Sequence, residues 1–160
     1  MASDYYLLLT GIAGETEAEG MENALELQNW GFSARSDADM GGSGLSAGKP
    51  DHSDFSCSFN LDKASFQLIT NLHKGTHIDT ATFTGRKTGG NATPYNYLVV
   101  TFTKVFVTSF DTGGGSTGTP VASLSLAFQT IQYQYYTQGT DGTVTLAGES
   151  SYDRKALKAA

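Results

Sequence analysis

Two long stretches decide the fold: YNYLVVTFTKVFVTSF at residues 95–110 and VASLSLAFQTIQYQYY at residues 121–136. Both alternate apolar and polar side chains, as a strand with one buried face does. In the first stretch the apolar positions change parity at Lys104, and in the second they change between Phe128 and Ile131. A strand can move its apolar side chains to the opposite face only through a bulge or a bend. The two stretches therefore predict corners at which strands pass from one sheet to another.

The remaining chain adds shorter strands and one helix. Strands are predicted at residues 5–12, 24–35, 54–61, 78–87 and 143–146, separated by glycine-bearing turns. A helix is predicted at residues 62–74, because Asp62 or Ser65 can cap its start and Gly75 fits the left-handed position after its end. The chain has 160 residues, which suits a single domain over residues 1–160. We expect a mainly β fold: a small β-barrel of two sheets with one flanking α-helix and a long extended loop.

That loop covers residues 36–50 and is the longest stretch without periodicity. It contains Gly41, Gly42, Gly44 and Gly48 among small and polar residues. Loops of this length are uncommon in compact domains and usually have a function or are disordered.

Charge and hydropathy exclude two classes of partner. The net charge of −6 would repel a phosphate backbone, so nucleic acid is not expected as a partner. No apolar run approaches the roughly 20 residues that span a bilayer, so membrane insertion is not expected. The apolar stretch at residues 5–9 follows Asp4, has no basic residue before it and is too short for a signal peptide. We therefore expect folding in the cytoplasm and export without a signal peptide.

The motifs that could carry chemistry are incomplete. Gly48-Lys49 resembles the end of a phosphate-binding loop, but Pro50 stands where Ser or Thr is required. Asp37 and Asp39 begin like a calcium loop, whose twelfth position is here Gly48 instead of a glutamate.

The histidines and the cysteine give no stronger signal. His73 and His77 have the spacing of a helical zinc site, but Gly75 ends the helix between them. Cys57 is expected to be a buried thiol on the apolar face of a strand. We expect no cofactor, no metal and no catalytic residue, and hence a structural protein rather than an enzyme.

Several short motifs follow one another in an order that extends over nearly the whole chain. They are Gly11, Gly14 and Glu15; Trp30; residues 47–49, 62–65, 75–78 and 86–90; residues 97–98, 104–109 and 113–114; and residues 124–128 and 133–135. Taken together, they resemble the Hcp (haemolysin-coregulated protein) family of bacterial type VI secretion systems. The chain departs from the family pattern at Phe66, where proline is frequent, and at Tyr152, where the family has tryptophan.

The resemblance implies a homohexameric ring whose copies stack into a tube. A contractile sheath would drive the tube, a spike protein would cap it, and small effector proteins would ride in its lumen. The long loop would contact a neighbouring subunit or ring through Asp37, Asp39, Met40, Ser43, Leu45 and Lys49. Two alternatives stay open: a phage-like tail-tube protein, and a secreted effector built on the same fold.

Overall fold

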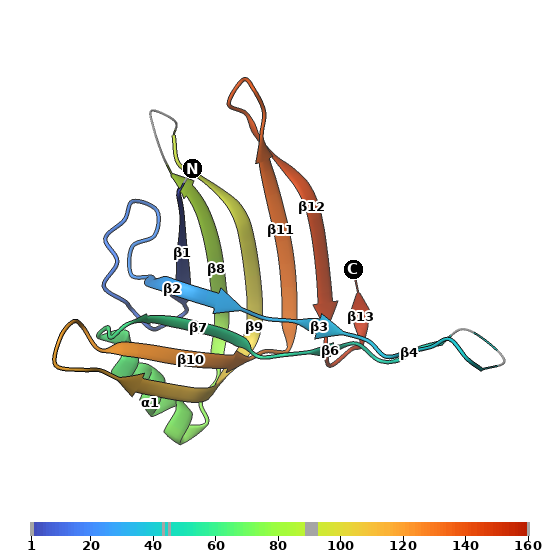
Figure 1. Cartoon of the computed structure of the whole chain (residues 1–160), viewed down its shortest axis with the longest axis horizontal. Coiled ribbons are helices and arrows are strands. Elements are labelled where there is room, and N and C mark those ends of the chain that lie inside the picture. The colour runs from blue at the N-terminus through green and yellow to red at the C-terminus, as the bar shows by residue number, and fades with distance from the viewer. Residues whose placement is uncertain (1, 43, 45, 89–92, 160) are drawn as a thin grey trace.

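A closed barrel with a sheet extending from it forms the body of the chain (Figure 1). The computed structural model describes residues 2–42, 44, 46–88 and 93–159. The barrel strands, in spatial order, are β10 (Val121–Ala127), β7 (Phe55–Asn60), β2 (Leu25–Gly31), β1 (Ala2–Leu9), β8 (Ile78–Thr88) and β9 (Tyr95–Gly113). Pairing of β9 with β10 closes the barrel. Beyond β9 the sheet continues through β11 (Thr130–Gln138), β12 (Val144–Asp153) and β13 (Lys158–Ala159). The expected mainly β barrel is confirmed.

The corner predicted at Lys104 is present. Residues of β9 up to Thr103 pair with β11, whereas those from Phe106 onward pair with β10. Lys104 lies between the two ladders with φ of 50°, and its neighbours on either side of the corner, Phe102 and Val105, are both buried. The positive φ at Lys104 thus lets β9 pair with β11 before the corner and with β10 after it.

The second corner differs from the prediction. Residues 121–136 do not form one bent strand, because the chain breaks at Phe128 and Gln129 and so gives β10 and β11. The backbone N–H of Gln129 donates to the carbonyl oxygen of Thr103, 3.0 Å away, which ties this break to the β9 corner. Phe128 remains buried, so the apolar pattern was interpreted correctly and only the continuity was wrong.

Aromatic side chains fill the barrel. Phe55, Phe83 and Phe102 are almost fully buried, and the ring centroid of Phe55 lies 5.4 Å from that of Phe83 and 5.1 Å from that of Phe102. Each such ring contributes about 2–3 kcal/mol by leaving water. Cys57 is buried in the same core, as expected, and burial raises the pKa of its thiol to about 12.

The helix α1 (Ala64–Lys74) lies against the barrel and contacts β9. An Asp62 carboxylate oxygen accepts the N–H of Ala64 at 2.9 Å, so Asp62 supports the helix start as predicted. Gly75 ends the helix with φ of 65°, also as predicted. Leu68 points into the core, whereas Phe66 is 68% exposed.

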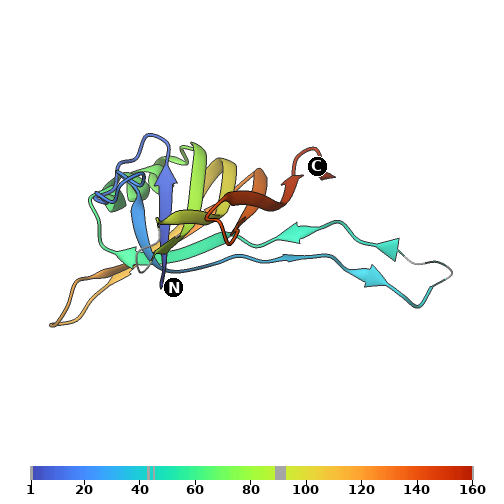
Figure 2. The same ribbon diagram turned by 90° about the horizontal axis from the view of Figure 1, so that it is seen from above.

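A long two-stranded arm projects from the barrel (Figure 2). At its root β3 (Ala34–Arg35) pairs with β6 (Asp51–His52), and farther out β4 (Ala38–Asp39) pairs with β5 (Ser46–Ala47). The strand predicted at residues 24–35 therefore ends at Gly31, and its last residues belong to the arm. The loop predicted at residues 36–50 is extended, as expected, but it is partly paired rather than irregular.

Candidate assembly surfaces

The arm carries the residues predicted to contact a neighbour. Asp37, Asp39, Met40 and Lys49 are all exposed, and Met40 is 73% exposed although it is apolar. Ser43 and Leu45, which were predicted with them, lie outside the described residues.

Hydrogen bonds within the arm use its polar side chains to fix the backbone. The hydroxyl of Ser36 donates to the carbonyl oxygen of Gly48 at 2.7 Å, and the Gly48 N–H donates to the carbonyl oxygen of Asp37. An Asp39 carboxylate oxygen accepts the N–H of Gly41 at 3.0 Å. These bonds hold two strands together without a hydrophobic face, which leaves the outward side chains available to another molecule.

The root of the arm packs on the end of β12. The rings of His52 and Tyr152 stack with centroids 5.2 Å apart, and the Phe128 ring meets His52 edge-on at 6.1 Å. Arg154 lies over the Phe128 ring at 5.4 Å and donates to the Phe128 carbonyl oxygen at 3.0 Å. Contacts among the arm root, the residues after β10 and the end of β12 thus fix the direction in which the arm projects.

Sequence reasoning assigned no role to His52 and noted Tyr152 only as a departure from the family pattern. Burial, followed by the charge of Arg154, lowers the pKa of His52, while Asp51 acts in the opposite direction. Nδ1 of His52 and the hydroxyl of Tyr152 are buried without a hydrogen-bond partner in the described part of the chain. The signal available in the sequence was an aromatic residue at position 152, directly followed by charged residues.

Two edges of the main sheet are open. β12 pairs with β13 only at Tyr152 and Asp153, so residues 144–151 have no strand on that side within the described chain. β1 lies between β2 and β8, but β2 pairs with it only at residues 5–7, so the backbone of Ala2 and Ser3 extends beyond β2 and forms the second open edge. Val144 and Leu146 on β12 are 40% and 48% exposed. An open strand edge is a template for pairing with another chain.

The strands β1 and β12 run in the same direction, and their ends lie at the same height in the sheet. From β1 to β12 the sheet crosses β8, β9 and β11, and every step is antiparallel, so β1 and β12 run the same way. A continuous row of paired residues joins Leu9, Ala81, Phe102, Ile131 and Tyr152. The C-terminal ends of the two edge strands therefore lie at the same level of the sheet (Figure 1).

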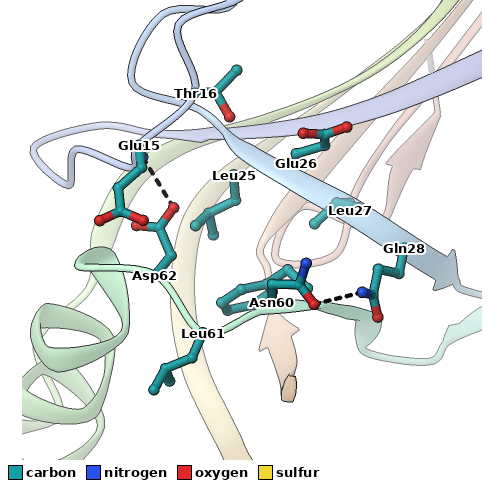
Figure 3. A pocket seen from close by; sticks show the side chains of 10 residues that line it. Glu15, Thr16, Leu25, Glu26, Leu27, Gln28, Asn60, Leu61 and Asp62 are labelled. Atoms are coloured by element: carbon teal, nitrogen blue, oxygen red, sulfur yellow. Dashed lines mark hydrogen bonds between the residues drawn. The ribbon is translucent and has the colours of Figure 1, made fainter. Parts of the chain in front are cut away.

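A cavity of about 430 Å³ lies where β2 and β7 diverge (Figure 3). The Asp62 carboxylate accepts the N–H of Glu15 at 3.0 Å as well as that of Ala64, and the side-chain amide of Gln28 donates to Asn60 at 2.7 Å. Asp62 thus joins the residues after β1 to the start of the helix. Its oxygens are occupied by backbone donors, which indicates a structural role.

The histidines of the incomplete zinc motif have different neighbours. Nε2 of His77 lies 3.2 Å from a carboxylate oxygen of Asp79, while His73 is in the last turn of α1 and His52 is at the arm root. Among the residues that the structure describes, no three His, Cys, Asp or Glu side chains come close enough together to hold a metal ion. The described part of the chain also contains no helix long and apolar enough to cross a membrane.

Comparison with known proteins identifies the class. Residues 6–135 match the family described as "Type VI secretion system effector, Hcp". The protein hcp1 of Pseudomonas aeruginosa is 33% identical over 90 residues, which are 56% of this chain and 55% of that protein. The match therefore covers about half the length of this curated relative.

Solved structures agree over the whole chain. Hcp1 of Salmonella typhimurium is 29% identical with a TM-score of 0.80, and the match covers 100% of both chains. A structure described as a type six secretion system protein shares the fold with a TM-score of 0.91 at 22% identity, covering 99% of this chain and 100% of its own.

The closed barrel with its extended sheet and projecting arm therefore belongs to a β-barrel protein of the type VI secretion class. The chain belongs to the Hcp family. That family consists of secreted structural tube proteins and is not a family of enzymes.

Proposed function

We propose that this chain is a tube subunit that closes into a ring through its two open sheet edges. In the ring, β12 of each copy lies beside β1 of the next, so that one sheet continues around the assembly. Because β1 and β12 run in the same direction, copies that all point the same way along the ring axis would pair these two strands in parallel. Head-to-tail contacts of this kind give a ring when the rotation between copies closes.

The observation that carries this proposal is the matching level of the two edges. The row through Tyr5 reaches Gly85, Leu98, Tyr135 and Gly148. The open residues of β1 precede Tyr5, and most of the open residues of β12 precede Gly148. Pairing of β12 in one copy with β1 in the next therefore brings together the backbone groups that have no partner strand within a single copy. Membership of the Hcp family supports six copies per ring, the number that the resemblance implies.

The arm would connect the rings of a stack. It projects past the β12 edge and presents Met40 and the charged residues Asp37, Asp39 and Lys49 (Figure 2). A spike protein at the tube end, a contractile sheath around it and effector proteins inside it complete the proposed set of partners. In this role the chain folds in the bacterial cytoplasm and is then secreted to the extracellular space or a target cell, and it performs no catalysis.

The proteins named in these comparisons belong to type VI secretion, which favours a secretion tube over a phage-like tail tube. The genes beside this one would test that choice. Sheath and ATPase genes of a secretion cluster support the proposal, and capsid and terminase genes contradict it.

Engineered cysteines test the ring interface directly. Ser3→Cys combined with Thr145→Cys or with Ala147→Cys places a thiol on each open edge. Oxidation should give a ladder of covalent oligomers ending at six copies on a non-reducing gel. The native Cys57 is buried with a raised thiol pKa, so it should not interfere.

The single variants Ser3→Cys and Thr145→Cys are the controls, because each leaves one edge without a thiol and should give no ladder. Electron microscopy and native mass spectrometry of the unmodified chain should show rings with a central hole. A chain that remains monomeric at high micromolar concentration would contradict the proposal.

A further inference from the structure

The loop that follows β1 is strongly acidic. Residues 13–24, here called the acidic loop, contain Glu15, Glu17, Glu19 and Glu22 and no basic residue. All four glutamates are exposed. Arg86 contacts this loop, but it donates to the carbonyl oxygen of Glu19 at 2.8 Å and leaves that carboxylate available. Glu17 and Glu19 therefore present negative charge outward.

A cavity of opposite charge lies at the far side of the sheet. It has a volume of about 360 Å³, and we call it the arm-root cavity. Its charged and polar lining comes from the arm root and from the end of β12, and consists of Lys49, Asp51, Gln129, Tyr152, Arg154 and Lys155.

The negative charges at this cavity have partners of their own, whereas two of the lysines do not. Asp51 lies 3.8 Å from Arg35. Asp153, beside the cavity, accepts the backbone N–H groups of Ala156 and Lys155 at 3.1 and 2.9 Å, and these bonds, with a smaller contribution from the charge of Lys155, lower its pKa and keep it ionised. Within the described chain Lys49 and Lys155 are exposed and make no ion pair. The cavity thus retains net positive charge.

The sheet brings these two features to the same level on opposite edges. The acidic loop follows the end of β1, and the row of paired residues from Leu9 at that end reaches Tyr152, which lines the arm-root cavity. When β12 of one copy lies beside β1 of the next, the cavity of the first copy and the loop of the second come to the same level of the ring, where β13 of the first copy also lies beside β12. We propose that the arm-root cavity is the docking site for the acidic loop of a second copy of this chain. This inference rests on the ring proposed above.

The docking would also brace the arm. The cavity is bounded by Lys49 and Pro50 of the arm and by Phe128 and Arg154 of the barrel side. A glutamate bound between Lys49 and Lys155 therefore contacts both parts at once. Ring closure and the direction of the arm become coupled, because the same loop that joins two copies holds the arm root of one of them.

Charge reversal on each side tests the docking. Glu17→Lys with Glu19→Lys makes the loop basic, and Lys49→Glu with Lys155→Glu makes the cavity acidic. On dilution, we expect rings of either variant to fall apart at a protein concentration roughly tenfold higher than wild-type rings do. This corresponds to a loss of about 1.4 kcal/mol of binding free energy per interface. The difference should shrink between 50 mM and 500 mM salt, because exposed charges are screened. Light scattering and native mass spectrometry measure both effects.

Mixing the two variants gives the sharpest readout. A basic loop then meets an acidic cavity in one contact, and an acidic loop meets a basic cavity in the next. Equimolar mixing should restore rings at wild-type concentrations, with the two variants present in a one-to-one ratio. Lys63→Glu with Lys74→Glu, at the two ends of α1, changes the net charge by the same amount as the cavity variant and should assemble like wild type.

The outcomes separate this proposal from the ring itself. If wild type forms rings and the cavity variant assembles equally well, the proposed docking is wrong but the proposed ring is still supported. Failure of the mixture to assemble, or an equal loss in the α1 control, also overturns the docking. Thermal melts that match wild type show that each variant is folded. A wild-type chain without rings contradicts the proposed function.

Discussion

Lys104 shows how one residue determines the course of the longest strand. A side chain other than glycine costs about 1–2 kcal/mol in the left-handed region, and the φ of 50° at Lys104 lies there. The strain is tolerated because Phe102 and Val105, on either side of it, both reach the core. Lys104 itself is exposed and has no packing role.

Substitutions at Lys104 should therefore act through the backbone. Lys104→Gly should raise the free energy of unfolding by up to about 1 kcal/mol, and Lys104→Val should lower it by about 1–2 kcal/mol. Urea denaturation measures both. Thr101→Gly, in the same strand without a positive φ, is the control and should be destabilising. A destabilised Lys104→Gly protein would contradict a left-handed corner.

His52 should make stability depend on pH. Its pKa is lowered in the folded chain by burial and by Arg154, so the unfolded chain takes up the proton first as pH falls. The neutral imidazole thus contributes stability that is complete above the ordinary pKa of 6.5 and declines as pH falls below it. We expect the free energy of unfolding to decrease from pH 7.5 to pH 5 by more in wild type than in His52→Phe, which keeps an aromatic ring against Tyr152. Equal slopes in urea titrations would exclude this role.

At the scale of elements, the arm contributes little to the folded core and is the part proposed to contact neighbouring rings. Its ladders contain only two residue pairs each, and none of the residues described in its outer part belongs to the core. Strands this short gain their order from the hydrogen bonds of Ser36, Asp37 and Gly48 and from the packing of His52 at the root.

Deletion of residues 41–47 should therefore leave the fold intact. We expect the circular dichroism spectrum to match that of wild type. The free energy of unfolding measured in urea should remain within about 0.5 kcal/mol of the wild-type value, as for surface changes in general. Tube formation, followed by electron microscopy, should be lost while single rings persist. An unfolded deletion protein would show that the arm belongs to the core, and normal tubes would show that stacking uses another surface.

In the proposed ring, the barrel continues its sheet through neighbouring copies. Hydrogen exchange should detect this. In rings, deuterium uptake at residues 144–149 of β12 should fall relative to a dilute monomer, because their N–H groups gain partners. The centres of β8 and β9, which have strands on both sides in one copy, should be protected in both states. Unchanged uptake along β12 would place the ring contact elsewhere.

The sequence alone determined the strands with an apolar face, the helix with its end at Gly75, the burial of Cys57 and the Lys104 corner; the helix begins at Ala64, two residues later than predicted. Alternation and capping are local, so they can be recognised without knowing what packs where. The long extended loop was also predicted, and motifs over nearly the whole chain indicated the Hcp family, which the family match confirms.

Only the tertiary structure decided the features that depend on pairing. Most of β12 has no apolar pattern, so its full length, residues 144–153 instead of the predicted 143–146, follows from its pairing with β11. The stacking of His52 on Tyr152 joins residues far apart in the chain, and no local signal encodes it. The matching level of the two open edges is likewise a sum of registers across the sheet, which is why the geometry of self-assembly appears only after the chain has folded.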